Sequence, residues 1–306
     1  MVKQLSQTVN SVYVCVRLLF LVVTFSLLVF PSSSFGYTDS TSTFDDFLRF
    51  VELENKRGKV ETSIITYTNT KGTSVDLIGV VHIGEKDYYQ ALEDHFEKMD
   101  ALLYEMVKPK NSNPEELRKS KSRVSSLQRF LKNTLRLEFQ LDVIDYNKKN
   151  FIHADMTPTS FSKAQEKQGE SLLGLLFESA MGQQAAMTPG DAVRENLRFL
   201  AALTNRNRNH ALKMFLGRQL GEMEKAVLGF GNGDKTGEDS GTVLLEGRNK
   251  VAIKTLRRTI RRNNFKRIGI FYGAAHMPDM EKRLLKMGFK KQRTQWLVAW
   301  DMTQAE

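Results

Sequence analysis

Two histidines, His82 and His276, each close an apolar run of the chain with the sequence Gly-x-x-His. The first run, residues 75–82, reads VDLIGVVH, and the second, residues 267–276, reads RIGIFYGAAH. Runs rich in β-branched and aromatic residues are typical of strands that are buried on both faces of a parallel sheet. Open α/β sheets bind ligands at the carboxyl ends of such strands. The two histidines are therefore the first candidates for a functional site.

Two acids and an arginine are further candidates. Glu105 lies in the apolar segment 101–107 (ALLYEMV), and Asp155 lies near the end of the segment 151–156 (FIHADM). A buried carboxylate is rare unless it is paired or ligated. The structural alternatives are a Glu105 held by an arginine or by backbone amides, and an Asp155 that caps a helix or turn. Arg248 can pair with an oxyanion or with a substrate carboxylate.

These residue types together indicate metal chemistry. Two neutral imidazoles and a carboxylate, His82, His276 and Glu105, can hold Zn²⁺, Mn²⁺ or Co²⁺ and leave a position for water, and Asp155 is a candidate fourth ligand. A bound divalent metal lowers the pKa of that water and polarises a carbonyl, as in the hydrolysis of amides and esters. The alternative for each histidine is a structural role, which is commoner for a single histidine at a strand end.

The elements around these residues predict an α/β fold with a central mixed, mainly parallel sheet flanked by helices. In the first half of the chain we expect a short helix, a strand that turns into the run 75–82, a helix, a strand in a parallel crossover, a second helix and a third strand. Their predicted ranges are 44–51, 61–68, 85–99, 101–107, 127–144 and 151–156.

The second half of the chain begins with a helical insertion at about residues 157–243, which interrupts the α/β pattern and can cover the site. A basic amphipathic helix at 244–262 carries Arg248 and Asn249 at its leading end. A strand, a helix and a last strand, which can pair antiparallel at the sheet edge, follow at 266–276, 277–287 and 295–301.

The first 36 residues predict a signal peptide or an N-terminal anchor, which leaves a domain at 44–306. Basic residues precede a short apolar run at 18–30, and small residues follow it. The single cysteine, Cys15, lies in this segment, so the exported chain has no thiol nucleophile, disulfide or Cys-rich zinc site. The formal net charge of +10 is compatible with association with an anionic membrane surface. The basic helix lacks interleaved aromatic residues, so no nucleic-acid partner is expected.

The motifs GVVH, YEM, EGRN and FYGAAH, followed by MPDMEKRLLKMGF, resemble those of the TraB/GumN family, which includes the TIKI metalloproteases. The resemblance covers roughly residues 60–302. It implies an EreA/ChaN-like α/β fold and a peptidase activity that depends on Mn²⁺ or Co²⁺ more readily than on Zn²⁺. It also implies that His82 and His276 are metal or catalytic residues and that Glu105 is the catalytic acid or base. Arg248 and Asn249 match an Arg-Asn pair of the family.

Three functions follow from these observations. The first is an exported metal-dependent hydrolase, a peptidase that acts on a peptide or small-molecule substrate in the periplasm, the cell envelope or the extracellular space. The second is a metal-free hydrolase in which His82 or Glu105 activates water as a general base. The third is a non-catalytic envelope protein that binds a peptide, haem or another small ligand.

Overall fold

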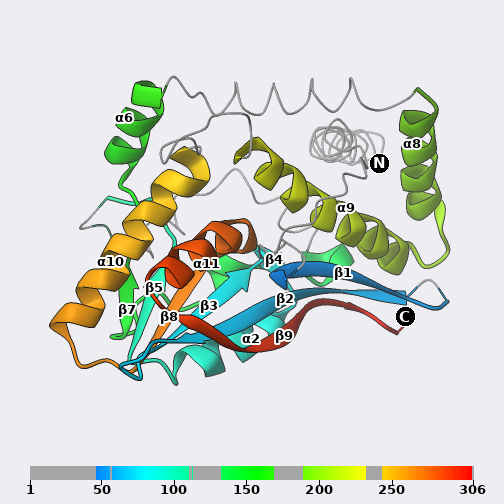
Figure 1. The fold of residues 1–306 in the computed structure, drawn as a ribbon. Helices are drawn as coiled ribbons and strands as arrows, with labels where there is room; N and C mark the ends of the chain where they lie inside the picture. Colours follow the sequence, from blue (N-terminus) through cyan, green and yellow to red (C-terminus); the bar gives the residue numbers. More distant parts are fainter. Residues whose placement is uncertain are drawn as a thin grey trace.

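The computed structural model describes residues 46–55, 57–109, 112, 132–168, 189–231 and 243–304 (Figure 1). Its centre is a mixed seven-stranded sheet flanked by helices, which confirms the predicted α/β class. The strands of this sheet are β1 (Leu48–Leu53), β2 (Arg57–Thr68), β3 (Ser74–Val80), β5 (Ala101–Tyr104), β7 (Phe151–His153), β8 (Arg267–Gly273) and β9 (Lys290–Met302).

Four strands form the parallel half of the sheet, in the order β3-β8-β5-β7. The strand–helix–strand unit from β3 to β5 is present as predicted, but β8 lies between its two strands. The carboxyl ends of all four strands therefore meet at one edge, and the last strand of the four in the sequence sits in the middle of them.

The antiparallel half of the sheet is organised by β2. One side of β2 pairs with β1 and then with β3, and the other side pairs along its length with β9. The predicted turn between β2 and β3 is confirmed: the Asn69 carboxamide oxygen accepts hydrogen bonds from the N–H groups of Lys71 and Thr73. Gly72 adopts a φ of 75°, which glycine tolerates best. The last strand, β9, pairs antiparallel as expected and is longer than the predicted range 295–301.

Two helix predictions in the first half of the chain are wrong. The segment 44–51 is predicted to be a helix, but its described part runs into β1, whose residues pair with β2 from Leu48 to Leu53. The predicted helix at 127–144 is interrupted at Arg136, which has a left-handed φ of 54°. The described part of that segment contains one helical turn at 132–135, then β6 (Glu138–Phe139) and the short helix α5 (Gln140–Val143).

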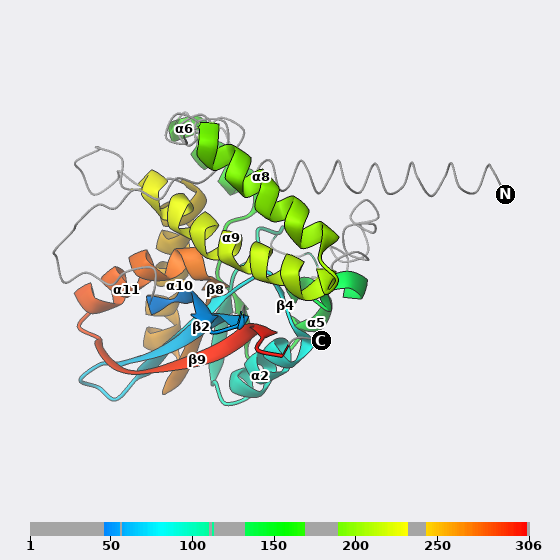
Figure 2. The same ribbon diagram turned by 90° about the vertical axis from the view of Figure 1, so that its right-hand side faces the viewer.

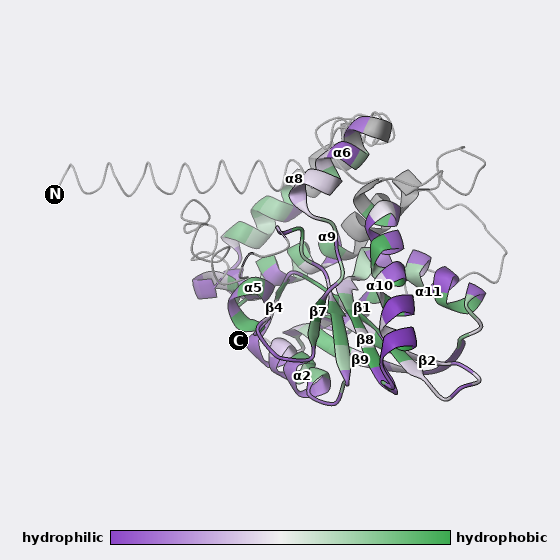
Figure 3. Ribbon diagram, turned by 90° about the vertical axis from the view of Figure 1, so that its left-hand side faces the viewer, coloured by the Kyte–Doolittle hydropathy of each residue, from purple (hydrophilic) through white to green (hydrophobic). Residues whose placement is uncertain are grey.

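Helices cover both faces of the sheet, which explains why its strands lack polar alternation. One core layer packs α2 (Lys86–Phe96) against side chains such as Ile78 and Phe271. The other layer packs α10 (Arg248–Arg262) and α11 (Met277–Lys286) against their strand neighbours Leu77 and Ile270. Figure 3 shows the apolar strands in green inside the molecule and the outer side of α10 in purple.

The described part of the predicted helical insertion is mostly helical, with a turn at residues 205–207. It contains α6 (Pro158–Gln168), α8 (Pro189–Thr204) and α9 (Arg208–Gly231), and the π-helical turn η2 (Val243–Gly247) leads directly into α10. Helices α8 and α9 pack against each other, and α9 contacts β1, β2 and β9 as well as the turn η3 (Ala274–His276) (Figure 2). Residues 169–188 and 232–242 of the insertion lie outside the described ranges.

The predicted signal peptide at residues 1–36 also lies outside the described part of the chain. Within the described ranges, none of the helices combines the length and the apolar character needed to cross a bilayer.

Candidate functional site

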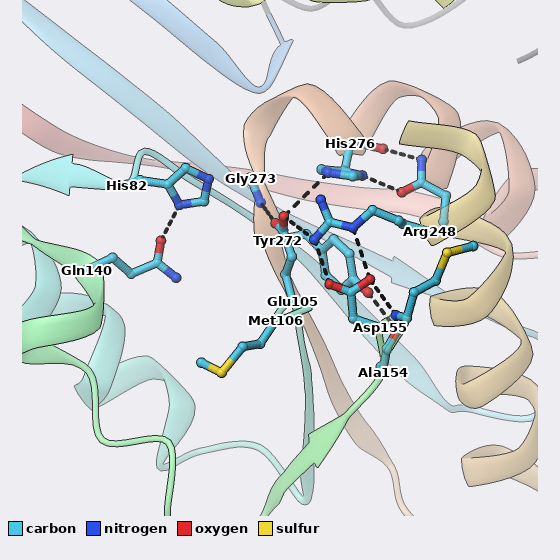
Figure 4. A network of polar contacts seen from close by, with 12 residues as sticks. His82, Glu105, Met106, Gln140, Ala154, Asp155, Arg248, Tyr272, Gly273 and His276 are labelled. Atoms are coloured by element: carbon cyan, nitrogen blue, oxygen red, sulfur yellow. Dashed lines mark hydrogen bonds and ion pairs between the residues drawn. The ribbon is translucent and has the colours of Figure 1, made fainter. Parts of the chain in front are cut away.

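The parallel half of the sheet brings the predicted site residues together at its carboxyl edge (Figure 4). His82 follows β3, Glu105 follows β5 and Asp155 follows β7, while β8 ends at Gly273 between His82 and Glu105. A Cβ atom placed on Gly273 would lie 3.5 Å from Glu105 Oε2, 3.5 Å from His82 Nε2 and 3.8 Å from His276 Cδ2. The two histidines and the glutamate therefore surround one point, directly over Gly273.

Glu105 is held as an ionised carboxylate. Its Oε2 accepts a hydrogen bond of 2.7 Å from the Gly273 N–H, and its Oε1 accepts one of 2.6 Å from Arg248 Nη2. His276 Nε2 lies 3.6 Å from the same Oε1. Burial alone would raise the pKa of Glu105, but His276, which is protonated at the acidic pH where Glu105 titrates, and the Arg248 guanidinium lower it to about 2. The structural alternative for this acid, a partnership with an arginine and a backbone amide, is thus present in the contacts.

Arg248 connects Glu105 to Asp155 in a buried ion-pair network. Its Nε donates to Asp155 Oδ1 over 3.0 Å, and its Nη2 donates to Asp155 Oδ2 over 2.5 Å. The Asp155 side chain is fully buried. Burial disfavours the guanidinium charge, but the hydrogen bonds to Asp155 and the charge of Glu105 raise the pKa of Arg248. Arg248 thus orients two carboxylates of its own chain, and its pairing with a substrate anion stays a prediction.

His276, on the turn after β8, is held in one tautomer by Asn249, the second residue of α10. Its Nδ1 lies 2.7 Å from Asn249 Oδ1, and the Asn249 amide group donates to the His276 carbonyl and to Asp279 Oδ2. Because that amide nitrogen has two acceptors, the amide oxygen must accept from a protonated Nδ1, so Nε2 carries the lone pair. Burial lowers the pKa of His276 to about 4, so the ring is neutral at pH 7.

His82 differs from His276 because its side chain is exposed to solvent. Its Nδ1 lies 2.7 Å from the side-chain oxygen of Gln140, which belongs to α5. Figure 4 shows His82 and His276 on opposite sides of Gly273, with Glu105 below them. The exposed ring of His82 therefore marks the side from which solvent reaches this group of residues.

The described residues include no set of three or more His, Cys, Asp or Glu side chains arranged as a ready-made metal site. The donor chemistry nevertheless fits a divalent cation, because an imidazole nitrogen, His82 Nε2, and the ionised Glu105 carboxylate flank the point over Gly273. His82, Glu105 and His276 are the residues that would hold it. Asp155 stays a predicted ligand, although both of its oxygens accept hydrogen bonds from Arg248.

Three residues of the site were not identified from the sequence. Gln140 falls inside a predicted long amphipathic helix, and no local pattern marks it as a partner of His82. Gly273 is recognisable in the sequence only as a strand end, although its lack of a side chain creates the space between the three groups. Tyr272 lies under the site: its hydroxyl donates to the Ala154 carbonyl over 2.6 Å, and its ring meets the His276 ring edge-on at 5.2 Å between centroids.

His153 is at the same sheet edge but outside the site. Its Nε2 lies 2.6 Å from the Met106 carbonyl oxygen, and burial lowers its pKa.

Comparison with known proteins adds no family assignment to this geometry: no protein-family model matches the chain, and no curated protein matches it in sequence.

Proposed function

We propose that this protein is an exported metal-dependent hydrolase, a peptidase of the TraB/GumN type. The observation that carries the proposal is the convergence of His82 Nε2, Glu105 Oε2 and the His276 ring on the space over Gly273. These groups come from the ends of three adjacent parallel strands, where α/β sheets place their reactive groups.

The chain supplies the protonation states that such a site needs at neutral pH. His276 is uncharged and Glu105 is ionised, so both keep lone pairs beside the shared space, where His276 Nε2 lies 3.6 Å from Glu105 Oε1. A divalent cation bound there would supply a coordinated water of lowered pKa and would polarise a carbonyl. Arg248 fixes the orientation of Glu105 by charge-assisted hydrogen bonds, and the exposed His82 stands where a substrate would enter.

The roles of Glu105 and His82 differ in this proposal. A carboxylate with a pKa of about 2 is a poor proton acceptor near pH 7, so Glu105 suits a ligand or electrostatic role better than that of a general base. His82 is the solvent-exposed member of the group and is the better candidate to exchange a proton with water.

One observation favours the metal-free hydrolase as a second candidate. The guanidinium of Arg248 already provides a positive charge 2.6 Å from Glu105 Oε1, close to the place that a metal would occupy. In that case His82 would act as a general base, and Arg248 would stabilise the site electrostatically without a metal. Dependence of turnover on metal separates the two candidates.

The test measures metal content by elemental mass spectrometry after dialysis of the chain from residue 37 against Mn²⁺, Co²⁺ or Zn²⁺. His82→Ala and His276→Ala are compared with His153→Ala, a histidine of the same sheet edge that lies outside the site. We expect about one metal per wild-type and His153→Ala chain, and loss in the other two variants while they remain folded. Hydrolysis of a peptide library with and without chelator completes the test. Equal metal-free results for every protein would reject the metal-dependent proposal.

Export and membrane association are part of the same proposal. Their support is the apolar run before residue 31 and the basic outer side of α10, where Lys254, Arg258 and Arg262 are exposed. Cell fractionation of the full-length chain, with N-terminal sequencing of the product, tests export and cleavage directly.

A further inference from the structure

We propose that Gln140 is a positioning residue that holds His82 in the tautomer with its proton on Nδ1. The unprotonated Nε2 then faces the space over Gly273. The inference deepens the proposed function and rests on it for its catalytic meaning, because it identifies what prepares one of the three converging groups.

A short β-ladder sets the position of Gln140. Strand β4 (Ile83–Gly84), which follows His82 directly, pairs antiparallel with β6, and Ile83 lies opposite Phe139. The next pair in this register is His82 and Gln140, and the Gln140 N–H donates to the His82 carbonyl over 2.9 Å. Side chains of directly opposed residues meet. The ladder therefore brings the amide of Gln140 to the ring of His82, with 2.7 Å between Gln140 Oε1 and His82 Nδ1.

The Gln140 side chain is itself fixed, unlike the exposed ring that it contacts. Gln140 is only 5% exposed, and its Nε2 donates to the Tyr146 hydroxyl over 2.7 Å. Tyr146 is buried and its ring packs against Tyr104, with 5.2 Å between the centroids. Burial raises the pKa of Tyr146, so its hydroxyl stays neutral in the physiological range. A buried amide with a second, fixed partner is suited to orienting an exposed imidazole.

The same arrangement occurs independently at His276. There a side-chain amide oxygen, that of Asn249, also contacts Nδ1, and the amide nitrogen is also bound elsewhere. Asn249 comes from α10 and Gln140 from α5, so no shared local motif produces the two contacts. In both cases the occupied Nδ1 leaves Nε2 directed toward the space beside Glu105 (Figure 4).

The orientation of the Gln140 amide decides the chemistry of His82. As placed, the amide oxygen accepts the Nδ1 proton and Nε2 can bind a cation or accept a proton. An amide turned over by half a rotation would donate to Nδ1 and accept from Tyr146, and the ring proton would then lie on Nε2. In that state His82 could serve neither role through Nε2, so the two orientations predict different tautomers.

The test is long-range ¹H–¹⁵N correlation spectroscopy of the histidine rings in metal-free protein labelled with ¹⁵N-histidine. It is recorded above the pH range in which exposed histidines titrate, and the signals of His82 are assigned by their loss in His82→Gln. We expect the wild-type ring to show a protonated Nδ1 and an unprotonated Nε2. Gln140→Leu should increase the Nε2–H form, whereas Gln140→Glu, which keeps an acceptor oxygen, should restore the Nδ1–H form.

Two controls separate this role from general damage. Gln90→Leu makes the same substitution at an exposed glutamine of α2 and should leave His82 unchanged. Asn249→Leu should alter the His276 tautomer and leave that of His82 intact. Where the wild-type chain binds metal, Gln140→Leu should weaken the affinity by about 10–100-fold and Gln140→Glu by less, as for other residues that orient ligands.

A wild-type His82 with its proton on Nε2, or a tautomer unaffected by Gln140→Leu, overturns the inference. The wild-type result needs no variant: a His82 ring with its proton on Nε2 overturns the inference even where a Gln140 variant fails to fold. The proposed function fails by a different result: a chain with the expected His82 tautomer that binds no metal and hydrolyses no substrate.

Discussion

Replacement of Gly273 by alanine should separate the chemistry of the site from the stability of the fold. The backbone of Gly273 has φ −50° and ψ 140°, which any residue can adopt. The nearest atoms to an added Cβ are the Glu105 and His82 side-chain atoms at 3.5 Å, an ordinary van der Waals distance. The Gly273 N–H that binds Glu105 is also present in alanine. No strain is therefore expected.

The expected change in stability is small and favourable. An alanine that fits the native backbone restricts the unfolded chain and stabilises a protein by about 0.4–1 kcal/mol. For a domain of this size, that corresponds to a rise in melting temperature of at most about 4 °C.

The expected change in function is large. Metal–nitrogen bonds are about 2.0–2.1 Å long, whereas the new methyl group would occupy the point 3.5 Å from His82 Nε2 and Glu105 Oε2. An ion held by both residues on the side that faces Gly273 would overlap with that methyl group. Gly273→Ala should therefore lower metal content and hydrolysis to the level of His276→Ala, in a protein at least as stable as the wild type.

The assay combines thermal denaturation, metal content and turnover, with Gly79→Ala as the matched control. Gly79 is also a strand glycine, and a Cβ atom added to it would lie 3.5 Å from the Ala274 Cβ and from the Phe47 carbonyl oxygen, away from the reacting groups. Wild-type metal binding and turnover in Gly273→Ala would refute the placement of the site over this residue. A fall of several degrees in melting temperature would refute the steric argument.

Three further predictions concern polar side chains around the sheet. Arg248→Met should lower the free energy of unfolding, measured with urea, by about 3–5 kcal/mol, because it leaves buried carboxylates unpaired. A change near zero would contradict the ion-pair network. Tyr67→Phe should lower the free energy of unfolding by about 1–3 kcal/mol, because the Tyr67 hydroxyl donates to buried Glu281. Adding Glu281→Leu should recover most of that loss in a double-mutant cycle. Equal stabilities of the single and the double variant would contradict this reasoning. Two backbone N–H groups lower the pKa of Asp100, so its stabilisation is present above the unfolded pKa and is lost as pH falls through the lower folded value. Asp100→Asn should therefore flatten the loss of stability on acidification in a pH series of denaturation curves, and an unchanged slope would contradict this.

The sequence allowed the core strands and most of the site to be predicted because both depend on local patterns. Apolar runs identify the strands, and a polar residue at the end of such a run lies at the sheet edge whatever the rest of the fold is. This reasoning placed His82, Glu105 and His276 at one edge. It could not show that β8 inserts between β3 and β5, because that order depends on pairing between distant segments, and the position of Gly273 follows from it.

The wrong helix predictions have specific physical causes. Residues 44–51 have apolar spacing that fits a helix, but Phe47 and Leu48 are buried beside β2, where pairing in β1 satisfies the backbone. Tertiary pairing overrides weak local preference in such short segments. At Arg136 the chain adopts a left-handed backbone conformation, and no glycine or proline in the neighbouring sequence indicates this turn. That turn directs the chain into β6 and so to Gln140, and the partner of His82 was missed for this reason.

Glu105 shows how two explanations of one residue can both be correct. A partnership with an arginine and a backbone amide was the structural alternative to a metal-ligand role, and the structure contains that partnership. The same guanidinium, however, also binds the fully buried Asp155. One positive charge therefore faces two carboxylates, and the adjoining His276 is neutral at pH 7. The network is left with a net negative charge next to an imidazole lone pair, an arrangement that a bound cation would stabilise. The contacts that hold Glu105 in place are thus compatible with the metal-ligand role that we propose for it.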